Sequence, residues 1–169
     1  MDTHGGGWTV LTLADAYNAG NRALHALTSA GESMSLRVVL SNTTQDSATV
    51  DYASVRVESE DQQFKIHIGK FLGPKGWDSL SYCNGMMFST FDKDNDWDSE
   101  IECAVKFRGG WWYRSCYEAN LNGLNLNGHY EDSISGIEWG TRGGWMQLFN
   151  YSYPGVLMAV RPSDIVNEY

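Results

Sequence analysis

The sequence concentrates its chemistry in an acidic run, Asp92-Lys-Asp-Asn-Asp-Trp-Asp-Ser-Glu-Ile-Glu102, which carries six carboxylates. Side chains at every second position of a looped backbone converge on one side. Oxygen ligands at this density suit Ca²⁺, which takes about six to eight of them, better than Mg²⁺, which needs strict octahedral geometry. The run is not an EF-hand, because its sixth position is Trp97 rather than Gly and its twelfth is Cys103 rather than Glu.

A solvated acidic turn is the ordinary alternative, since runs of like charge are usually exposed faces without a metal. Calcium is favoured here because carboxylates packed so tightly repel one another unless a cation offsets their charge. The sequence therefore predicts a Ca²⁺ site in this run.

The three cysteines, Cys83, Cys103 and Cys116, cannot all pair within one chain. Cys103 and Cys116 enclose a short Gly/aromatic segment, which suits a disulfide, a buried reduced pair or two metal ligands. Zinc is disfavoured, because the chain has no Cys-x-x-Cys and its four histidines are scattered. Cys83 is left over, and we interpret it as a small buried hydrophobic residue.

Length and charge limit the classes of partner. With 169 residues, one domain is the default. Lys and Arg number 12 against 21 Asp and Glu, for a net charge of -9, so nucleic acid is a poor candidate partner. No apolar run approaches the roughly 20 residues that span a bilayer, and Met1 to Val10 lacks the basic start and apolar stretch of a secretion signal.

Hydrophobic patterns predict regular structure mainly in the first half of the chain. Alternating apolar residues and a turn at 59–62 indicate an antiparallel hairpin. Asn21 is predicted to cap a short helix whose Leu24 and Leu27 face the core. The expected strands are Met34–Leu40, Thr49–Val57, Gln63–Ile68 and Gly155–Arg161, and the expected helix is Arg22–Thr28.

Between Gly69 and Pro154 the sequence is rich in Gly, Asn and aromatic residues and has few periodic stretches. Six of the seven tryptophans fall here and are expected to be buried: Trp77, Trp97, Trp111, Trp112, Trp139 and Trp145. The predicted fold class is α+β: an antiparallel sheet with short helices, followed by a long loop-rich C-terminal region stabilised by calcium and a disulfide.

Three pieces of sequence together carry a family resemblance. They are Gly5-Gly-Gly-Trp-Thr-Val10, Asn84-Gly-Met-Met-Phe-Ser-Thr-Phe-Asp-Lys-Asp-Asn-Asp96, and Cys103-Ala-Val-Lys-Phe-Arg-Gly-Gly-Trp-Trp-Tyr-Arg-Ser-Cys116 followed by Asn120-Leu-Asn-Gly123. The chain resembles a fibrinogen C-terminal (fibrinogen-related) domain, as in ficolins, tachylectins, angiopoietins and tenascins. The match is continuous from about Gly31 to Pro162.

The resemblance implies a secreted, extracellular recognition module and not an enzyme. It implies a Cys103–Cys116 disulfide and one Ca²⁺ held by the side chains of Asp94 and Asp96, with backbone carbonyls around Asp98 and Glu100. The stretch before Cys103 has one residue more than the family pattern, which often places a Gly there.

Lectin-like members of the family hold an acetyl group in an aromatic pocket beside the Ca²⁺ loop. The resemblance implies a cis peptide at Ser115–Cys116. Three positions depart from the family pattern: Phe107 where Tyr is common, Tyr117 where His is frequent, and Ser133-Ile134 in place of Tyr-Ala. Losing hydroxyl and imidazole partners weakens polar fixation of an acetyl group. The candidate ligand-binding residues are Phe107, Tyr113, Ser115, Cys116, Tyr117, Ser133, Ile134 and Trp139.

Two functions follow from the resemblance. The first is a Ca²⁺-supported module that binds glycans or acetylated groups in innate immune recognition. The alternative is a protein-interaction, matrix or receptor-ligand module without sugar binding, which the pocket substitutions favour. An enzyme is the weakest class, because the chain has no Gly-x-Ser-x-Gly, no His-Glu-x-x-His and no phosphate-cradling Gly loop.

Residues 1–169 are expected to form a single fibrinogen-related domain that lacks the family's first cysteine pair and part of its N-terminal region. Only Leu11 to Asn21 joins the first strand to the helix, so we expect Trp8 to be poorly buried. The chain has no collagen-like or coiled-coil stem, so oligomers are expected only through missing or partner segments.

Overall fold

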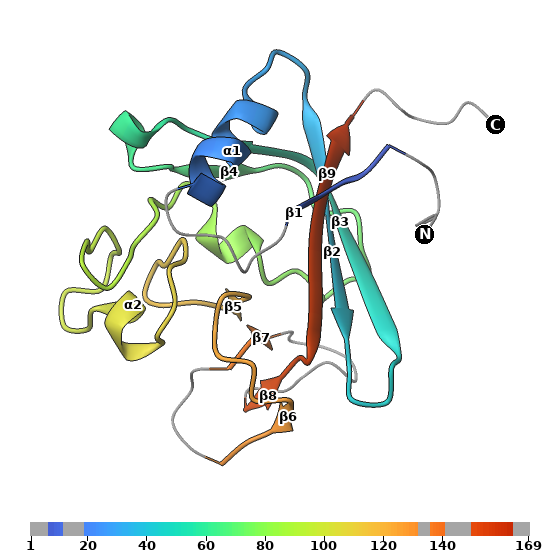
Figure 1. Cartoon of the computed structure of the whole chain (residues 1–169), viewed down its shortest axis with the longest axis vertical. Helices are drawn as coiled ribbons and strands as arrows, with labels where there is room; N and C mark the ends of the chain where they lie inside the picture. The colour runs from blue at the N-terminus through green and yellow to red at the C-terminus, as the bar shows by residue number, and fades with distance from the viewer. Residues whose placement is uncertain (1–6, 12–18, 132–135, 141–149, 164–169) are drawn as a thin grey trace.

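The computed structural model describes residues 7–11, 19–131, 136–140 and 150–163. Its main element is a five-stranded antiparallel sheet with strand order β1-β9-β2-β3-β4, on which the helix α1 (Ala19–Thr28) lies (Figure 1). The strands are β1 (Thr9–Leu11), β2 (Met34–Ser41), β3 (Ser47–Val57), β4 (Ile66–Ile68) and β9 (Gly155–Pro162). The predicted α+β class and its antiparallel sheet are confirmed.

The alternation of buried and partly exposed side chains along the strands explains why these segments form a sheet with one face in the core. Along β2, Leu36, Val38 and Leu40 are buried, while the residues between them lie on the partly exposed opposite face. The strand at 63–68 is shorter than predicted, because Gln63 and Phe64 have φ of 55° and 51° and belong to the turn. That turn contains a single 3₁₀ turn, Glu60–Gln62.

The helix α1 differs from the prediction at its start and on one face. It begins at Ala19, so Asn21 lies inside the helix and is buried rather than capping it. Leu24 packs against the core as expected, but Leu27 is 38% exposed. The last turn of the helix is joined to β3 by a hydrogen bond, which the Val57 N–H donates to the Thr28 hydroxyl at 2.9 Å.

Between β4 and β9, the described residues form short elements only. The helix α2 (Cys103–Lys106) is followed by two small antiparallel pairs, β5 (Ala119–Asn120) with β7 (Glu138–Trp139) and β6 (Gly128–His129) with β8 (Tyr151–Ser152). A single 3₁₀ turn, Ser81–Cys83, precedes them. The loop-rich character predicted for this region is confirmed.

Aromatic side chains hold this region against the sheet. Trp111 and Trp112 are buried and pack edge to face with ring centroids 5.3 Å apart. The Trp112 indole donates a hydrogen bond to the Phe64 carbonyl at 2.7 Å, and the Trp139 indole donates one to Trp77 at 2.9 Å. Hydrogen bonds donated by buried indole N–H groups fix these loops, which form few backbone hydrogen bonds of the kind found between strands.

Two tryptophans depart from the expectation. Trp97 is 59% exposed, and its ring lies 5.3 Å from the Arg114 guanidinium, so the prediction that it is buried is wrong. Trp8 is half-buried, and the guanidinium groups of Arg37 and Arg161 lie 4.6 and 4.5 Å from the centre of its ring. Trp145 lies outside the described residues.

Within the described ranges, no helix is both long and apolar enough to cross a membrane.

Cys83 is the free cysteine, and it is buried, as the sequence suggested. Its thiol donates a hydrogen bond to the Leu80 carbonyl, and burial raises the pKa of the thiol well above its usual range. A buried, protonated thiol is a poor nucleophile.

We therefore expect the native protein to show almost no reaction with Ellman's reagent at pH 8, and one thiol per chain to react after denaturation without a reductant. The measurement is a time course of thiol release in buffer and in guanidinium chloride. Rapid reaction in buffer would contradict the burial of Cys83. Two further thiols in guanidinium would contradict the disulfide.

Candidate functional site

The acidic loop, defined here as residues 92–102, is built from successive aspartate turns. An Asp94 carboxylate oxygen accepts a hydrogen bond from the Asp96 N–H at 3.1 Å, and Asp96 accepts one from the Asp98 N–H at 2.8 Å. Asp98 in turn accepts from the N–H groups of Glu100 and Ile101, each at 3.1 Å. Aspartate favours such turns because its short side chain reaches the backbone two residues ahead.

Two hydrogen bonds attach this loop to the Cys103–Cys116 disulfide, which the structure contains as predicted. The second oxygen of Asp96 accepts the Cys103 N–H at 2.9 Å, at the start of α2. The second oxygen of Asp98 accepts the Ser115 hydroxyl at 2.9 Å. The loop is thus joined to both ends of the disulfide-closed segment.

The two central aspartates differ in their electrostatics. Burial raises the pKa of the Asp96 carboxyl, and the neighbouring Asp94 carboxylate raises it further, partly offset by the N–H groups that Asp96 accepts. The pKa of Asp98 is instead lowered, first by the Glu100 N–H and then by the Ser115 hydroxyl. Asp94 and Asp96 therefore form a carboxylate pair whose mutual repulsion a cation would relieve.

The acidic loop offers oxygen atoms of the kind that a hard cation takes. Asp94 and Asp96 supply carboxylate oxygens. The Asp98 carboxylate is engaged by its three hydrogen-bond donors, which leaves its backbone carbonyl as the possible ligand. Within the described residues, neither the Asp98 nor the Glu100 carbonyl accepts a hydrogen bond. Two carboxylates and two free carbonyls are the mixed oxygen ligands that Ca²⁺ takes.

A second group of potential ligand atoms does not form a metal site. The carboxylate of Asp98 and the sulfurs of Cys103 and Cys116 lie within 4.8 Å of one another. Both sulfurs are bonded to each other, so neither is available as a thiolate ligand.

A cavity of about 200 Å³ opens between the acidic loop, α2 and the segment after the tryptophan pair. We call it the Tyr117 pocket. The peptide bond between Ser115 and Cys116, in its wall, is cis. Its lining residues are Asp98, Ile101, Lys106, Phe107, Ser115, Cys116 and Tyr117.

Of the predicted ligand-binding residues, four thus line this pocket: Phe107, Ser115, Cys116 and Tyr117. Tyr113 is fully buried behind it, with its ring centroid 6.3 Å from Phe107 and 6.2 Å from Tyr117, so it supports the wall without lining the pocket. Trp139 is also fully buried and does not line it. Ser133 and Ile134 lie outside the described residues.

The sequence reasoning missed Glu138, which is fully buried in the adjacent strand β7. One carboxylate oxygen accepts the Tyr117 hydroxyl at 2.7 Å. The other accepts the Tyr130 hydroxyl and, at 3.0 Å, the Asn150 N–H. Burial, and after it this carboxylate, raises the pKa of Tyr117. Glu138 therefore fixes the tyrosine of the pocket wall.

The place of Glu138 between Ile137 and Trp139 was the available signal in the sequence, since a charge between two apolar residues of a short strand needs buried partners.

We expect Glu138→Ala to destabilise the fold by about 3 kcal/mol, because two hydroxyls and an N–H lose their buried acceptor, and to lower the Tm by roughly 6–12 °C. Thermal unfolding followed by circular dichroism checks this. The matched control is Glu131→Ala, which removes an exposed carboxylate and should leave the Tm nearly unchanged. Equal Tm values for the two variants would contradict the anchoring role.

Comparison with known proteins agrees with this architecture. A family model described as the C-terminal globular domain of the fibrinogen beta and gamma chains matches residues 11–163. The chain therefore belongs to the fibrinogen C-terminal domain family.

Among curated relatives, Techylectin-5A of Tachypleus tridentatus is 36% identical over 97% of this chain and 62% of its own length. Ryncolin-4 of Cerberus rynchops is 35% identical over 96% of this chain and 52% of its own length. The chain thus spans about half to three-fifths of these relatives. Among solved structures, the fibrinogen-like globe domain of human ANGPTL2 has a TM-score of 0.82 and 30% identity, covering 95% of this chain and 82% of that one.

Proposed function

We propose that this chain is a calcium-supported extracellular recognition module that binds acetylated groups of glycans in the Tyr117 pocket. The observation that carries the proposal is the convergence of the acidic loop, the disulfide and an aromatic pocket at one place. The name of the relative Techylectin-5A, a lectin, supports the same class of function. The proposal includes secretion and excludes catalysis by this chain.

Asp94 and Asp96 are the proposed Ca²⁺ ligands, with the backbone carbonyls of Asp98 and Glu100. The ion would supply charge that holds the acidic loop closed. Because Asp96 and Asp98 also hold Cys103 and Ser115, an ordered loop keeps the wall of the Tyr117 pocket in place.

The pocket suits a small group with an apolar methyl and a polar carbonyl. The rings of Phe107 and Tyr117 pack edge to face at 4.8 Å and can enclose a methyl. The N–H groups of Cys116 and Tyr117 donate to no acceptor in the described part of the chain, so both remain available to a ligand carbonyl oxygen. The Tyr117 hydroxyl is already bound by Glu138 and contributes no further donor.

A protein ligand is the second candidate function. Lys106 at the pocket and the nearby exposed Trp97 and Val105, 59% and 50% exposed, form a mixed surface of the kind that protein partners bury. The similarity to the ANGPTL2 domain supports this alternative at the level of fold.

Calcium should raise the melting temperature in a concentration-dependent way, because it binds the folded loop and not the unfolded chain. At about 100 times the Kd the gain is about 2.7 kcal/mol. Asp94→Ala and Asp96→Ala should each abolish the rise, whereas Asp61→Ala, an exposed aspartate in the β3–β4 turn, should keep it. Differential scanning calorimetry with Ca²⁺ and with EDTA measures all four proteins. A full rise in both loop variants would contradict the ligand assignment.

N-acetylglucosamine should shift the amide NMR signals of residues 107 and 115–117 in the presence of Ca²⁺, and EDTA should remove the effect. Tyr117→Ala should weaken this binding about tenfold or more, because it removes one wall of the pocket. Leu72→Ala, at a site 55% exposed and outside the pocket lining, is the control and should bind as the parent does. Glucosamine, which lacks the acetyl group, should give no shift. Equal shifts for both sugars would leave the protein-ligand alternative as the better account.

A further inference from the structure

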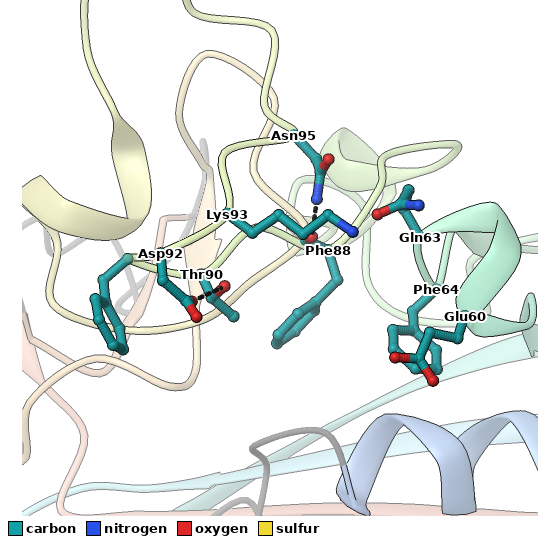
Figure 2. A pocket seen from close by; sticks show the side chains of 9 residues that line it. Glu60, Gln63, Phe64, Phe88, Thr90, Asp92, Lys93 and Asn95 are labelled. Atoms are coloured by element: carbon teal, nitrogen blue, oxygen red, sulfur yellow. Dashed lines mark hydrogen bonds between the residues drawn. The ribbon is translucent and has the colours of Figure 1, made fainter.

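A second, larger pocket lies where the start of the acidic loop meets the β3–β4 turn. Its volume is about 340 Å³, within the range of small-molecule sites, and we call it the Phe88 pocket. Its walls come from the β3–β4 turn and from the segment that leads into the acidic loop (Figure 2). The lining residues are Glu60, Gln63, Phe64, Phe88, Thr90, Phe91, Asp92, Lys93 and Asn95, none of which lines the Tyr117 pocket.

Hydrogen bonds hold the two walls together without a ligand. The Phe88 N–H donates to the Gln63 carbonyl at 2.9 Å, which joins one wall to the other. Thr90 and Lys93 close a turn with reciprocal backbone bonds of 2.9 and 3.1 Å. The Asn95 amide donates to the Phe88 carbonyl at 2.7 Å, as the dashed line in Figure 2 shows. The pocket is therefore pre-organised, which lowers the entropic cost of binding.

Aromatic rings supply the apolar part of the pocket. Phe64 and Phe88 line the pocket but are largely buried, 7% and 8% exposed, whereas Phe91 is 65% exposed. An exposed phenylalanine beside a cavity offers a ring face that water solvates poorly. The C–H face of a sugar ring packs against such rings, while its hydroxyls need donors and acceptors nearby.

Among the polar groups of the pocket, the Lys93 ammonium is left without a hydrogen-bond partner in the part of the chain that the structure describes. The Glu60 carboxylate is paired with Arg22 at 2.7 Å, and that of Asp92 accepts the Thr90 hydroxyl at 2.6 Å. The Lys93 ammonium has no hydrogen bond or ion pair with any residue that the structure describes. In Figure 2 it extends across the pocket towards Gln63. A free ammonium group in the pocket is complementary to a carboxylate on the ligand.

We propose that the Phe88 pocket is a second glycan subsite and that it binds an acidic sugar unit, with the ring against Phe91 and Phe88 and the carboxylate on Lys93. The inference rests on the proposed function as a glycan-recognition module and adds a substrate class to it. The acidic loop then serves two sites, with Lys93 and Asn95 in one and Asp98 in the other.

The test is an amide NMR titration of the calcium-loaded protein with D-glucuronate and with D-glucose, which differ in the carboxylate alone. Glucuronate should shift the signals of residue 63 and residues 88–95 saturably, and glucose should bind these residues about tenfold more weakly. Lys93→Gln should reduce glucuronate affinity about tenfold and leave glucose affinity unchanged. Phe91→Ala should weaken both sugars. Lys75→Gln is the matched control, since it removes an exposed lysine outside the pocket.

Three results would overturn the inference. They are equal affinity for glucuronate and glucose, unchanged glucuronate affinity in Lys93→Gln, and tighter binding of an acidic Glu-containing peptide than of glucuronate at the same signals. A parallel titration with N-acetylglucosamine separates this inference from the proposed function. Shifts at residues 107 and 115–117 with N-acetylglucosamine, together with none at 88–95 with glucuronate, mean that only the second subsite is absent.

Discussion

The hydrogen bond from the Cys103 N–H to the Asp96 carboxylate is the interaction on which the candidate site depends. It joins a loop of like charges, which would otherwise spread apart, to a buried helix start that the disulfide fixes. The Ser115–Asp98 bond repeats the connection at the other end of the disulfide-closed segment. The Tyr117 pocket takes its wall from this arrangement, because Asp98, Ser115 and Cys116 all line it.

In the second half of the chain, packing of aromatic side chains holds the segments together, as strand pairing does in the first half. Trp111 and Trp139 are fully buried in a region whose strands are two residues long. Indole groups that donate to backbone carbonyls, as Trp112 does to Phe64, combine a large apolar contact with a directional bond. The Trp111 indole, in contrast, is held by packing alone, since its buried N–H has no hydrogen-bond partner in the described part of the chain.

The sheet was predictable because the alternation at β2 and β3 depends on local sequence alone. The resemblance also indicated the disulfide, and four of the predicted ligand-binding residues do line one pocket. Sequence patterns did not predict features that depend on residues far apart in the chain. Trp97 is exposed and contacts Arg114 at the surface, and Asn21 lies inside its helix because that helix starts at Ala19, three residues before the predicted start. The role of Glu138 could not be inferred either, since Tyr117, Tyr130 and Asn150 approach it only in the folded chain.

The strand β9 occupies an interior place in the sheet, between β1 and β2, although it is the last strand of the chain order (Figure 1). During synthesis the earlier strands leave the ribosome first and must wait with an open edge until residues 155–162 emerge. Unpaired edges of this kind are prone to association with other chains. The edge of β2 therefore stays open to other chains until β9 pairs between it and β1.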